Sequence, residues 1–287
     1  MSKRLRLNGI IGALERGDTA FVSWSAPEVE MAQSLSGSAY DGVMIDSEHF
    51  PWDGRVLRDC LQYLLDRGQI VASGSLAPRV TPLIRVSANG VEKNQFLAKQ
   101  ALDIGAYGIV WPHISSVDQA YNAVAACRYP RLPAASRHEP AGIRGDGPLN
   151  AARYWGLTPK EYYERADVWP LDPDGEILVI LQCEDVAGIE SLSDILENVP
   201  GIGAILIGEG DLSQELGHPR EYEHPDVLSA VAEIVSICNA HDVIVAHPHA
   251  ELGNTERLLE EGFRLLMSSP SRSYEKLDLG RKLSGRS

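Results

Sequence analysis

The most informative segment of the sequence is Val43-Met44-Ile45-Asp46-Ser47-Glu48-His49, in which an apolar run leads directly into two carboxylates and an imidazole. Because a charged group is costly to bury, we expect these side chains to emerge where a buried strand ends. Three other apolar runs end in the same manner, at Leu181-Gln182-Cys183-Glu184, Ile207-Gly208-Glu209-Gly210-Asp211 and Pro82-Leu83-Ile84-Arg85. Polar side chains at the carboxyl ends of several strands form the active site of a (β/α)8 barrel. The sequence therefore predicts an α/β fold of the TIM-barrel type, and an enzyme.

Length and composition agree with this prediction. A closed α/β barrel commonly reaches the size of this chain, which has 287 residues, 44% of them hydrophobic. We therefore expect a single domain that spans residues 1–287. The net charge of -14 leaves no excess of cations to neutralise phosphates, which argues against a nucleic-acid partner. A small anionic substrate remains compatible with this charge, because it needs only one local positive site such as a metal ion.

The sequence also indicates the cellular compartment of the protein. Four cysteines are scattered along the chain without the pair spacing of a metal site, at Cys60, Cys127, Cys183 and Cys238. Residues 1–8 are basic but lack an apolar core, so we interpret them as the start of a helix and not as a targeting segment. No apolar run is long enough to cross a bilayer. We expect a cytoplasmic protein with reduced thiols and no membrane partner.

The periodicity of apolar residues predicts alternating strands and helices. The expected strands span 19–24, 41–45, 81–86, 107–111, 177–181, 204–207, 243–246 and 264–267. The expected helices span 28–36, 53–65, 91–103, 117–127, 159–166, 187–197, 225–240, 252–261 and 273–283. Residues 131–175 differ, because they are rich in proline and contain a Gly-Ile-Arg-Gly-Asp-Gly turn cluster. So long an excursion between barrel elements indicates a functional or interfacial role.

Two carboxylates are candidate metal ligands. Glu184 and Asp211 follow neighbouring predicted strands, and barrel geometry brings adjacent strand ends close together. Oxygen ligands of this kind suit Mg²⁺ or Mn²⁺, with positions left open for water or substrate. The alternative is that each carboxylate only caps the helix that follows it.

Two basic side chains are candidate catalytic groups. Arg85 could stabilise an enolate or carboxylate oxygen, or it could form a structural pair with Asp46 or Glu48. His49 could be an imidazole oriented by Asp46, or an ordinary loop histidine. Three other histidines follow predicted strands without the spacing of a helical zinc pair, and we do not assign them as ligands. They are His113, His247 and His249.

Five motifs in this order resemble the HpcH/HpaI aldolases, which are class II, metal-dependent, pyruvate-utilising enzymes typified by 2,4-dihydroxyhept-2-ene-1,7-dioate aldolase. The resemblance covers residues from about 19 to about 267. It rests on Asp46-Ser47-Glu48-His49, Pro82-Leu83-Ile84-Arg85, Ala141-Gly142-Ile143-Arg144-Gly145, Gln182-Cys183-Glu184 and Gly210-Asp211-Leu212-Ser213.

This resemblance implies a barrel of the phosphoenolpyruvate/pyruvate superfamily that cleaves a 4-hydroxy-2-oxo acid reversibly to pyruvate, or a related 2-oxo acid, and an aldehyde. Glu184 and Asp211 would hold the divalent cation, Mg²⁺ or Mn²⁺, with Co²⁺ as a further candidate. Gln182, Gly210, Asp211 and Ser213 would contact the substrate, whose carboxylate would meet backbone amides near Gly210.

The catalytic groups implied by the resemblance are Arg85, His49 and Asp46. Arg85 would stabilise the enolate oxygen and the developing alkoxide, and His49, oriented by Asp46, would relay protons. In the family, barrels pair by exchanging their eighth helix and the dimers assemble further into hexamers. The resemblance thus implies a homo-oligomer in which the helix at 273–283 is exchanged.

The chain departs from the family pattern at Glu209, where the family has proline. This additional carboxylate either alters the charge beside the metal or turns away to meet Arg144. The segments 66–80 and 131–139 are longer than usual, and His113 stands where methionine is common.

Two other functions stay open. One is oxaloacetate decarboxylation with enolate addition to another acceptor, as in the macrophomate-synthase branch. The other is a non-catalytic barrel that binds a small acid.

Overall fold

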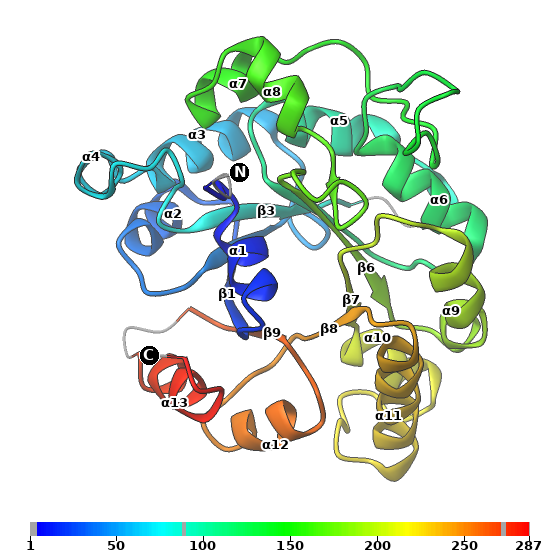
Figure 1. Cartoon of the computed structure of the whole chain (residues 1–287). Helices are drawn as coiled ribbons and strands as arrows, with labels where there is room; N and C mark the ends of the chain where they lie inside the picture. Colours follow the sequence, from blue (N-terminus) through cyan, green and yellow to red (C-terminus); the bar gives the residue numbers. More distant parts are fainter. Residues whose placement is uncertain (1–4, 88–89, 271–273, 287) are drawn as a thin grey trace.

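The computed structural model describes residues 5–87, 90–270 and 274–286, and it confirms the predicted (β/α)8 barrel. Eight parallel strands close the barrel, with helices on the outside (Figure 1). These strands are β1 Ala20–Ser25, β2 Gly42–Asp46, β3 Thr81–Arg85, β4 Gly108–Trp111, β6 Ile177–Cys183, β7 Ala204–Ile207, β8 Ile244–His247 and β9 Leu265–Ser268. Pairing of β4 with β6 and of β9 with β1 completes the closure. A two-residue strand, β5 Val168–Trp169, pairs with the start of β6 and was not predicted.

The helices largely follow the predicted positions. They are α1 Gly9–Glu15, α2 Val29–Ser36, α3 Gly54–Leu64, α4 Arg67–Ser73, α5 Gln95–Asp103, α6 Val117–Ala126, α7 Leu149–Trp155, α8 Pro159–Arg165, α9 Val186–Asn198, α10 Glu209–Glu215, α11 Pro225–Ala240, α12 Thr255–Glu260 and α13 Glu275–Leu283, with a 3-10 turn at Gly90–Glu92. Four of these helices, α1, α4, α7 and α10, match none of the predicted helix ranges. Within the described residues, no helix combines the length and the apolar character needed to cross a membrane.

Helix α1 lies at the amino-terminal end of the barrel and packs into its interior. Its buried residues, among them Ile10 and Ile11, join a cluster with inward-facing strand residues such as Met44. A Cβ at Gly42 would lie 2.4 Å from the Ile10 side chain, so glycine is required where α1 approaches β2. Asn8 caps the helix through its side chain. The prediction that residues 1–8 begin a helix is therefore wrong for the described part of that segment, because the helix starts only at Gly9.

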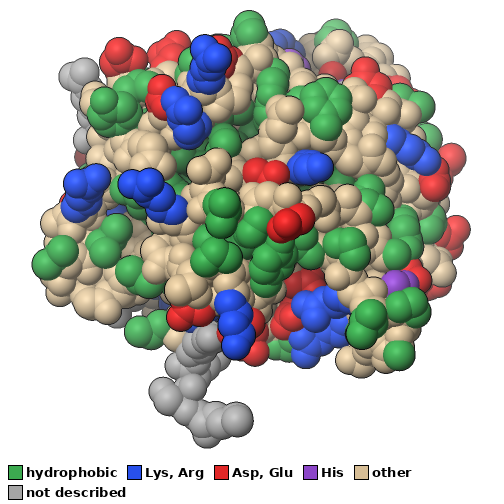
Figure 2. All heavy atoms as spheres, turned by 90° about the horizontal axis from the view of Figure 1, so that it is seen from above, with side chains coloured by type: hydrophobic (Ala, Val, Ile, Leu, Met, Phe, Trp, Pro, Cys, Tyr) green, Lys and Arg blue, Asp and Glu red, His purple; other side chains and the backbone are tan. Residues whose placement is uncertain are grey.

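The long connection between β4 and β6 is anchored to the barrel by a buried arginine. Arg128, which is fully buried, donates hydrogen bonds to both carboxylate oxygens of Asp167 at 2.7 and 3.0 Å. It also donates to the carbonyls of Arg137, His138 and Pro140. Seen from the side of α7 and α8, acidic, basic and apolar side chains are interspersed (Figure 2). The net negative charge therefore forms no uniform patch on this face.

Helix α13 packs on the barrel of its own chain. Leu277 is buried, and a Cβ at Gly280 would lie 2.6 Å from the Phe21 ring. Beyond the helix, the Arg286 guanidinium pairs with Asp41 at 2.6 Å. The predicted helix began at residue 273, which lies outside the described residues.

Candidate active site

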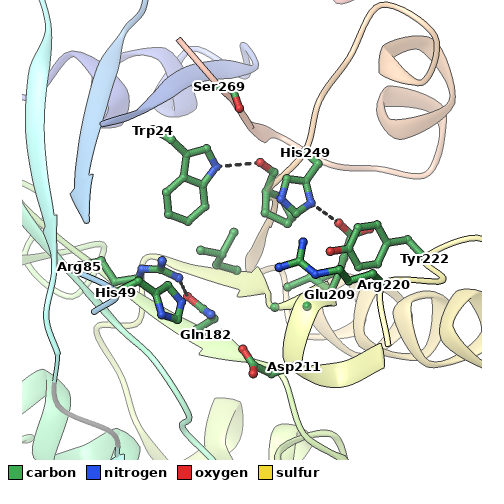
Figure 3. Close-up of a pocket in the computed structure, with 15 residues that line it drawn as sticks. Trp24, His49, Arg85, Gln182, Glu209, Asp211, Arg220, Tyr222, His249 and Ser269 are labelled. Atoms are coloured by element: carbon green, nitrogen blue, oxygen red, sulfur yellow. Dashed lines mark hydrogen bonds and ion pairs between the residues drawn. The ribbon is translucent and has the colours of Figure 1, made fainter. Parts of the chain in front are cut away.

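A cavity of about 290 Å³ opens at the carboxyl ends of the strands. Its walls come from segments far apart in the sequence (Figure 3). They are Trp24, His49, Arg85, Gln182, 206–211, Arg220, Tyr222, Pro248, His249 and Ser269. Five of the predicted site residues line it: His49, Arg85, Gln182, Gly210 and Asp211. The polar side chains that follow these predicted strands therefore meet at one end of the barrel.

Arg85 is held at the end of β3 by two acids and an aromatic ring. Its guanidinium forms a two-pronged pair with Asp46, with N···O distances of 2.9 and 2.8 Å, and a further ion pair with Glu48 at 2.8 Å. The guanidinium carbon lies 4.7 Å from the centre of the Trp24 ring. Register explains the first contact, because Asp46 and Arg85 are partners in the β2–β3 pairing. The structural pairing considered from the sequence is thus present, while Arg85 also faces the cavity.

Gln182 connects Arg85 to Glu184. Its side-chain oxygen accepts a hydrogen bond from Arg85 at 3.4 Å, and its amide nitrogen donates to Glu184 Oε2. Glu184 Oε1 accepts a hydrogen bond from the backbone N–H of His113 at 2.6 Å. On its other side Glu184 lies against Gly208, where a Cβ would be 2.3 Å from Oε2. Glu184 therefore lies beside Gly208, the residue that precedes α10.

The electrostatics around Glu184 suit a cation. Burial, together with the negative charge of Glu48, raises the pKa of Glu184 to about 7, although His113 and Gln182 oppose the shift. One ligand atom each from Glu48, His113 and Glu184 lies within 4.8 Å of the others. Glu48 Oε2 is buried and makes no well-directed hydrogen bond. Such oxygen-rich donors fit a hard divalent cation, which would relieve the buried negative charge. Glu184, with Asp211 or with Glu48 and His113, could hold it.

Asp211 and Ser213 occupy different environments on α10. Asp211 is partly exposed and lines the cavity, and among the described residues it receives only a long hydrogen bond from Gln214, at 3.5 Å. Its carboxylate is therefore available to a ligand. Ser213 is fully buried; its hydroxyl donates to the Gly210 carbonyl and accepts the Arg220 N–H. The structure therefore places Ser213 behind the cavity wall, where it fixes the loop that presents Arg220.

His49 is exposed at the cavity rim, and its ring lies 3.7 Å from Glu48 Oε2. Asp46, which was predicted to orient His49, instead binds Arg85 and the backbone N–H of Glu48. Burial alone would raise the pKa of Asp46, but the hydrogen bonds and charge of Arg85, the Glu48 N–H and the charge of His49 lower it. The influence of Asp46 on His49 is thus electrostatic in this structure.

Glu48 and His113 also belong to the candidate site, although the sequence did not indicate either as a ligand. Glu48 was considered from the sequence only as a structural partner of Arg85, and the structure contains that ion pair, at 2.8 Å. His113 has a positive φ of 51°, which is rare for a residue other than glycine and costs of order 1–3 kcal/mol. This conformation lets its backbone N–H and its ring both meet Glu184, the ring at 3.3 Å.

Glu209 does not meet Arg144, contrary to one of the two expectations. Arg144 is buried beside Asp103 and Tyr162. Glu209 instead lies between His247 and His249 at the end of β8. Burial would raise the pKa of Glu209, but hydrogen bonds from these two histidines lower it to about 2.

The chain belongs to the HpcH/HpaI aldolase/citrate lyase family, whose model matches residues 20–267. It is 34% identical over 223 residues to 2-keto-3-deoxy-L-rhamnonate aldolase of Klebsiella pneumoniae, covering 77% of this chain and 72% of that relative. It is 31% identical over 228 residues to 4-hydroxy-2-oxovalerate aldolase of Rhodococcus jostii, covering 79% and 76%. Among solved structures, a family protein from Burkholderia cenocepacia superposes with a TM-score of 0.74 at 26% identity, over 97% of this chain and 98% of the other.

Proposed function

We propose that the protein is a metal-dependent aldolase that cleaves a 4-hydroxy-2-oxo acid reversibly into pyruvate, or a related 2-oxo acid, and an aldehyde. The observation that carries the proposal is the hydrogen-bonded series Arg85–Gln182–Glu184, which joins a guanidinium to a buried carboxylate at the barrel mouth. The names of the aldolase relatives support the same reaction class.

In this proposal Glu184 and Asp211 hold a divalent cation, Mg²⁺ or Mn²⁺, with Co²⁺ as a further candidate. When bound, such a cation would act as a Lewis acid that polarises the 2-oxo group of the substrate. Gln182 keeps Glu184 oriented through its amide, and Glu184 must be deprotonated to serve as a ligand. The open backbone at Gly210, where an added Cβ would meet nothing within 4 Å, leaves room for the substrate carboxylate.

In this proposal Arg85 stabilises the negative charge that develops on the 2-oxo oxygen during cleavage. Asp46 and Glu48 hold the guanidinium before the substrate arrives, so little reorganisation is needed when that charge forms. His49, exposed at the rim and next to Glu48, is assigned to proton transfer at the methyl carbon of pyruvate.

The same enolate could be produced from oxaloacetate by loss of carbon dioxide. Incubation with oxaloacetate separates the two functions: release of carbon dioxide faster than cleavage of any 4-hydroxy-2-oxo acid would favour the decarboxylating enzyme.

The test of the aldolase assignment is exchange of the methyl protons of pyruvate in deuterated water, followed by NMR. We expect exchange only with added Mg²⁺ or Mn²⁺, and its loss by at least about a hundredfold in Glu184→Gln and Asp211→Asn. Glu197→Gln, an exposed substitution on the outer helix α9, is the matched control and should exchange normally. Exchange at the wild-type rate in either site variant would refute the assignment of the metal ligands.

We further propose a cytoplasmic homo-oligomer. Four buried free cysteines support the reducing location. The exchange of α13 between protomers stays a prediction.

A further inference from the structure

Glu209, Arg220, Tyr222 and His249 form a polar wall of the cavity that the proposed function has not used. Its centre is Glu209, a side chain with little solvent exposure at the first residue of α10. One carboxylate oxygen lies 3.2 Å from His247 Nε2, and the other lies 2.7 Å from His249 Nδ1. Glu209 therefore has one imidazole on each oxygen.

The hydrogen bonds define which nitrogen of each ring carries a proton. His247 Nδ1 accepts the backbone N–H of His249 at 3.2 Å, so the neutral ring of His247 carries its proton on Nε2 and donates it to Glu209. His249 donates its Nδ1 proton to the other oxygen of the same carboxylate. In the neutral His249 ring, the lone pair is therefore on Nε2.

The His249 ring is fixed in the cavity wall. It stacks on Tyr222 with an interplanar angle of 19° and a centroid distance of 5.7 Å. Half of its side chain is exposed, although the carboxylate behind it is nearly buried. His249 lies across the cavity from Arg85 and His49 (Figure 3). A carboxylate that orients an imidazole exposed in a cavity wall is the arrangement of a general acid–base group.

We propose that His249, oriented by Glu209, is the acid–base residue for the hydroxyl group on the aldehyde half of the substrate. This inference rests on the proposed aldolase function. In cleavage, His249 Nε2 takes the proton of the 4-hydroxyl, the C3–C4 bond breaks, and C4 becomes the aldehyde carbon. The electron pair of that bond remains on the pyruvate half as the enolate, which is then protonated at C3. In addition, His249 returns its proton to the alkoxide.

Because His249 is proposed to act only on the aldehyde half, its loss should affect two half-reactions differently. Exchange of pyruvate methyl protons needs no group on the aldehyde half, whereas cleavage of 4-hydroxy-2-oxovalerate does. In His249→Asn the side-chain amide can keep the bond to Glu209 while the base is absent. We expect kcat for cleavage to fall by about 10²- to 10⁴-fold with KM little changed, whereas Mn²⁺-dependent exchange stays within about threefold of wild type.

Two further measurements distinguish a catalytic role of His249 from a structural role. Added imidazole should restore part of the cleavage rate in His249→Ala, because the cavity is open to solvent, and should leave His249→Asn unaffected. The matched control is His241→Asn. His241 lies between α11 and β8, away from the cavity, and forms a hydrogen bond with Ser193. Its substitution should leave both half-reactions intact.

Parallel loss of exchange and cleavage in His249→Asn, or cleavage at the wild-type rate, would overturn the proposal. Absence of metal-dependent exchange in the wild-type protein would instead refute the aldolase function itself. The two failures are therefore distinguishable.

Discussion

At the level of single residues, Arg85 combines an observed structural contact with a proposed catalytic role. Its fork of donors matches the two oxygens of Asp46, and a lysine cannot make that two-pronged contact. We expect Arg85→Lys to lower the rate of pyruvate proton exchange by about 10²- to 10³-fold, because the charge no longer lies where the enolate oxygen forms.

The test measures pyruvate proton exchange by NMR and, in parallel, Mn²⁺ affinity by calorimetric titration. Because Arg85 touches neither proposed metal ligand directly, Mn²⁺ affinity should be preserved in Arg85→Lys. Loss of metal binding would give Arg85 a purely structural role.

The pKa of Glu184, which burial raises to about 7, predicts how metal affinity depends on pH. A protonated carboxylic acid is a poor ligand, so the proton competes with the cation below that pH. The apparent affinity should fall by about tenfold for each pH unit below 7 and should level off above it. Calorimetric Mn²⁺ titrations between about pH 5.5 and 8.5 test this dependence. Affinity that is constant over this interval would contradict the assignment of Glu184.

At the scale of elements, the turn from β7 to α10 depends on a close approach to β6. A methyl group at Gly208 would lie 2.3 Å from Glu184 Oε2, so Gly208→Ala must displace that carboxylate. We expect at least about a tenfold loss of Mn²⁺ affinity, since ligand positions must hold to a few tenths of an ångström. Gly54→Ala is the control, because an added methyl there meets nothing within 4 Å. Unchanged affinity in Gly208→Ala would show that Glu184 does not bind the metal from this position.

The Arg128–Asp167 pair predicts a loss of stability. Asp167→Asn removes the charge that compensates a fully buried guanidinium, and breaking a buried pair costs about 3–5 kcal/mol. Urea denaturation should show this loss, while Asp174→Asn, an exposed neighbour in the same connection, should be close to neutral. A loss below about 1 kcal/mol would mean that the carbonyl contacts of Arg128 suffice.

The same pair contributes to acid sensitivity. Burial raises the pKa of Asp167, but the hydrogen bonds from Arg128 lower it, and the net effect is a decrease. Its contribution to folding is therefore present above about pH 3.9, the ordinary aspartate value, and is lost as the pH falls through the lower pKa of the folded state. The stability difference between wild type and Asp167→Asn should shrink in that acidic interval.

At the scale of the whole molecule, the barrel was predictable because each of its strands is a short buried run bounded by turn residues. Helix α4 was not, because none of its residues is buried and it carries no apolar face to recognise. Helix α7 lies in a proline-rich region, and its buried Tyr154 and Trp155 owe their position to packing with Tyr107. Strand β5 has only two residues and exists through its pairing with β6.

The candidate site was predictable only in part for a related reason. Arg85, Gln182 and Asp211 lie at the ends of predicted strands or shortly after them, so barrel topology brings all three to one cavity. The contact of Glu209 with His247 and His249 joins α10 to the end of β8, and no local pattern indicates it. The role of Glu48 depends on a side-chain direction in the loop after β2, which the sequence does not specify.

Helix α13 could determine how protomers assemble. The helix covers Phe21 and contributes the buried Leu277, each worth about 1.5–3 kcal/mol when removed from water. If protomers exchange this helix, light scattering should give a multiple of two subunits for the full chain. A chain that ends at Pro270 should be folded but monomeric. A monomeric full chain, or a truncated chain that keeps the size of the full assembly, would contradict helix exchange.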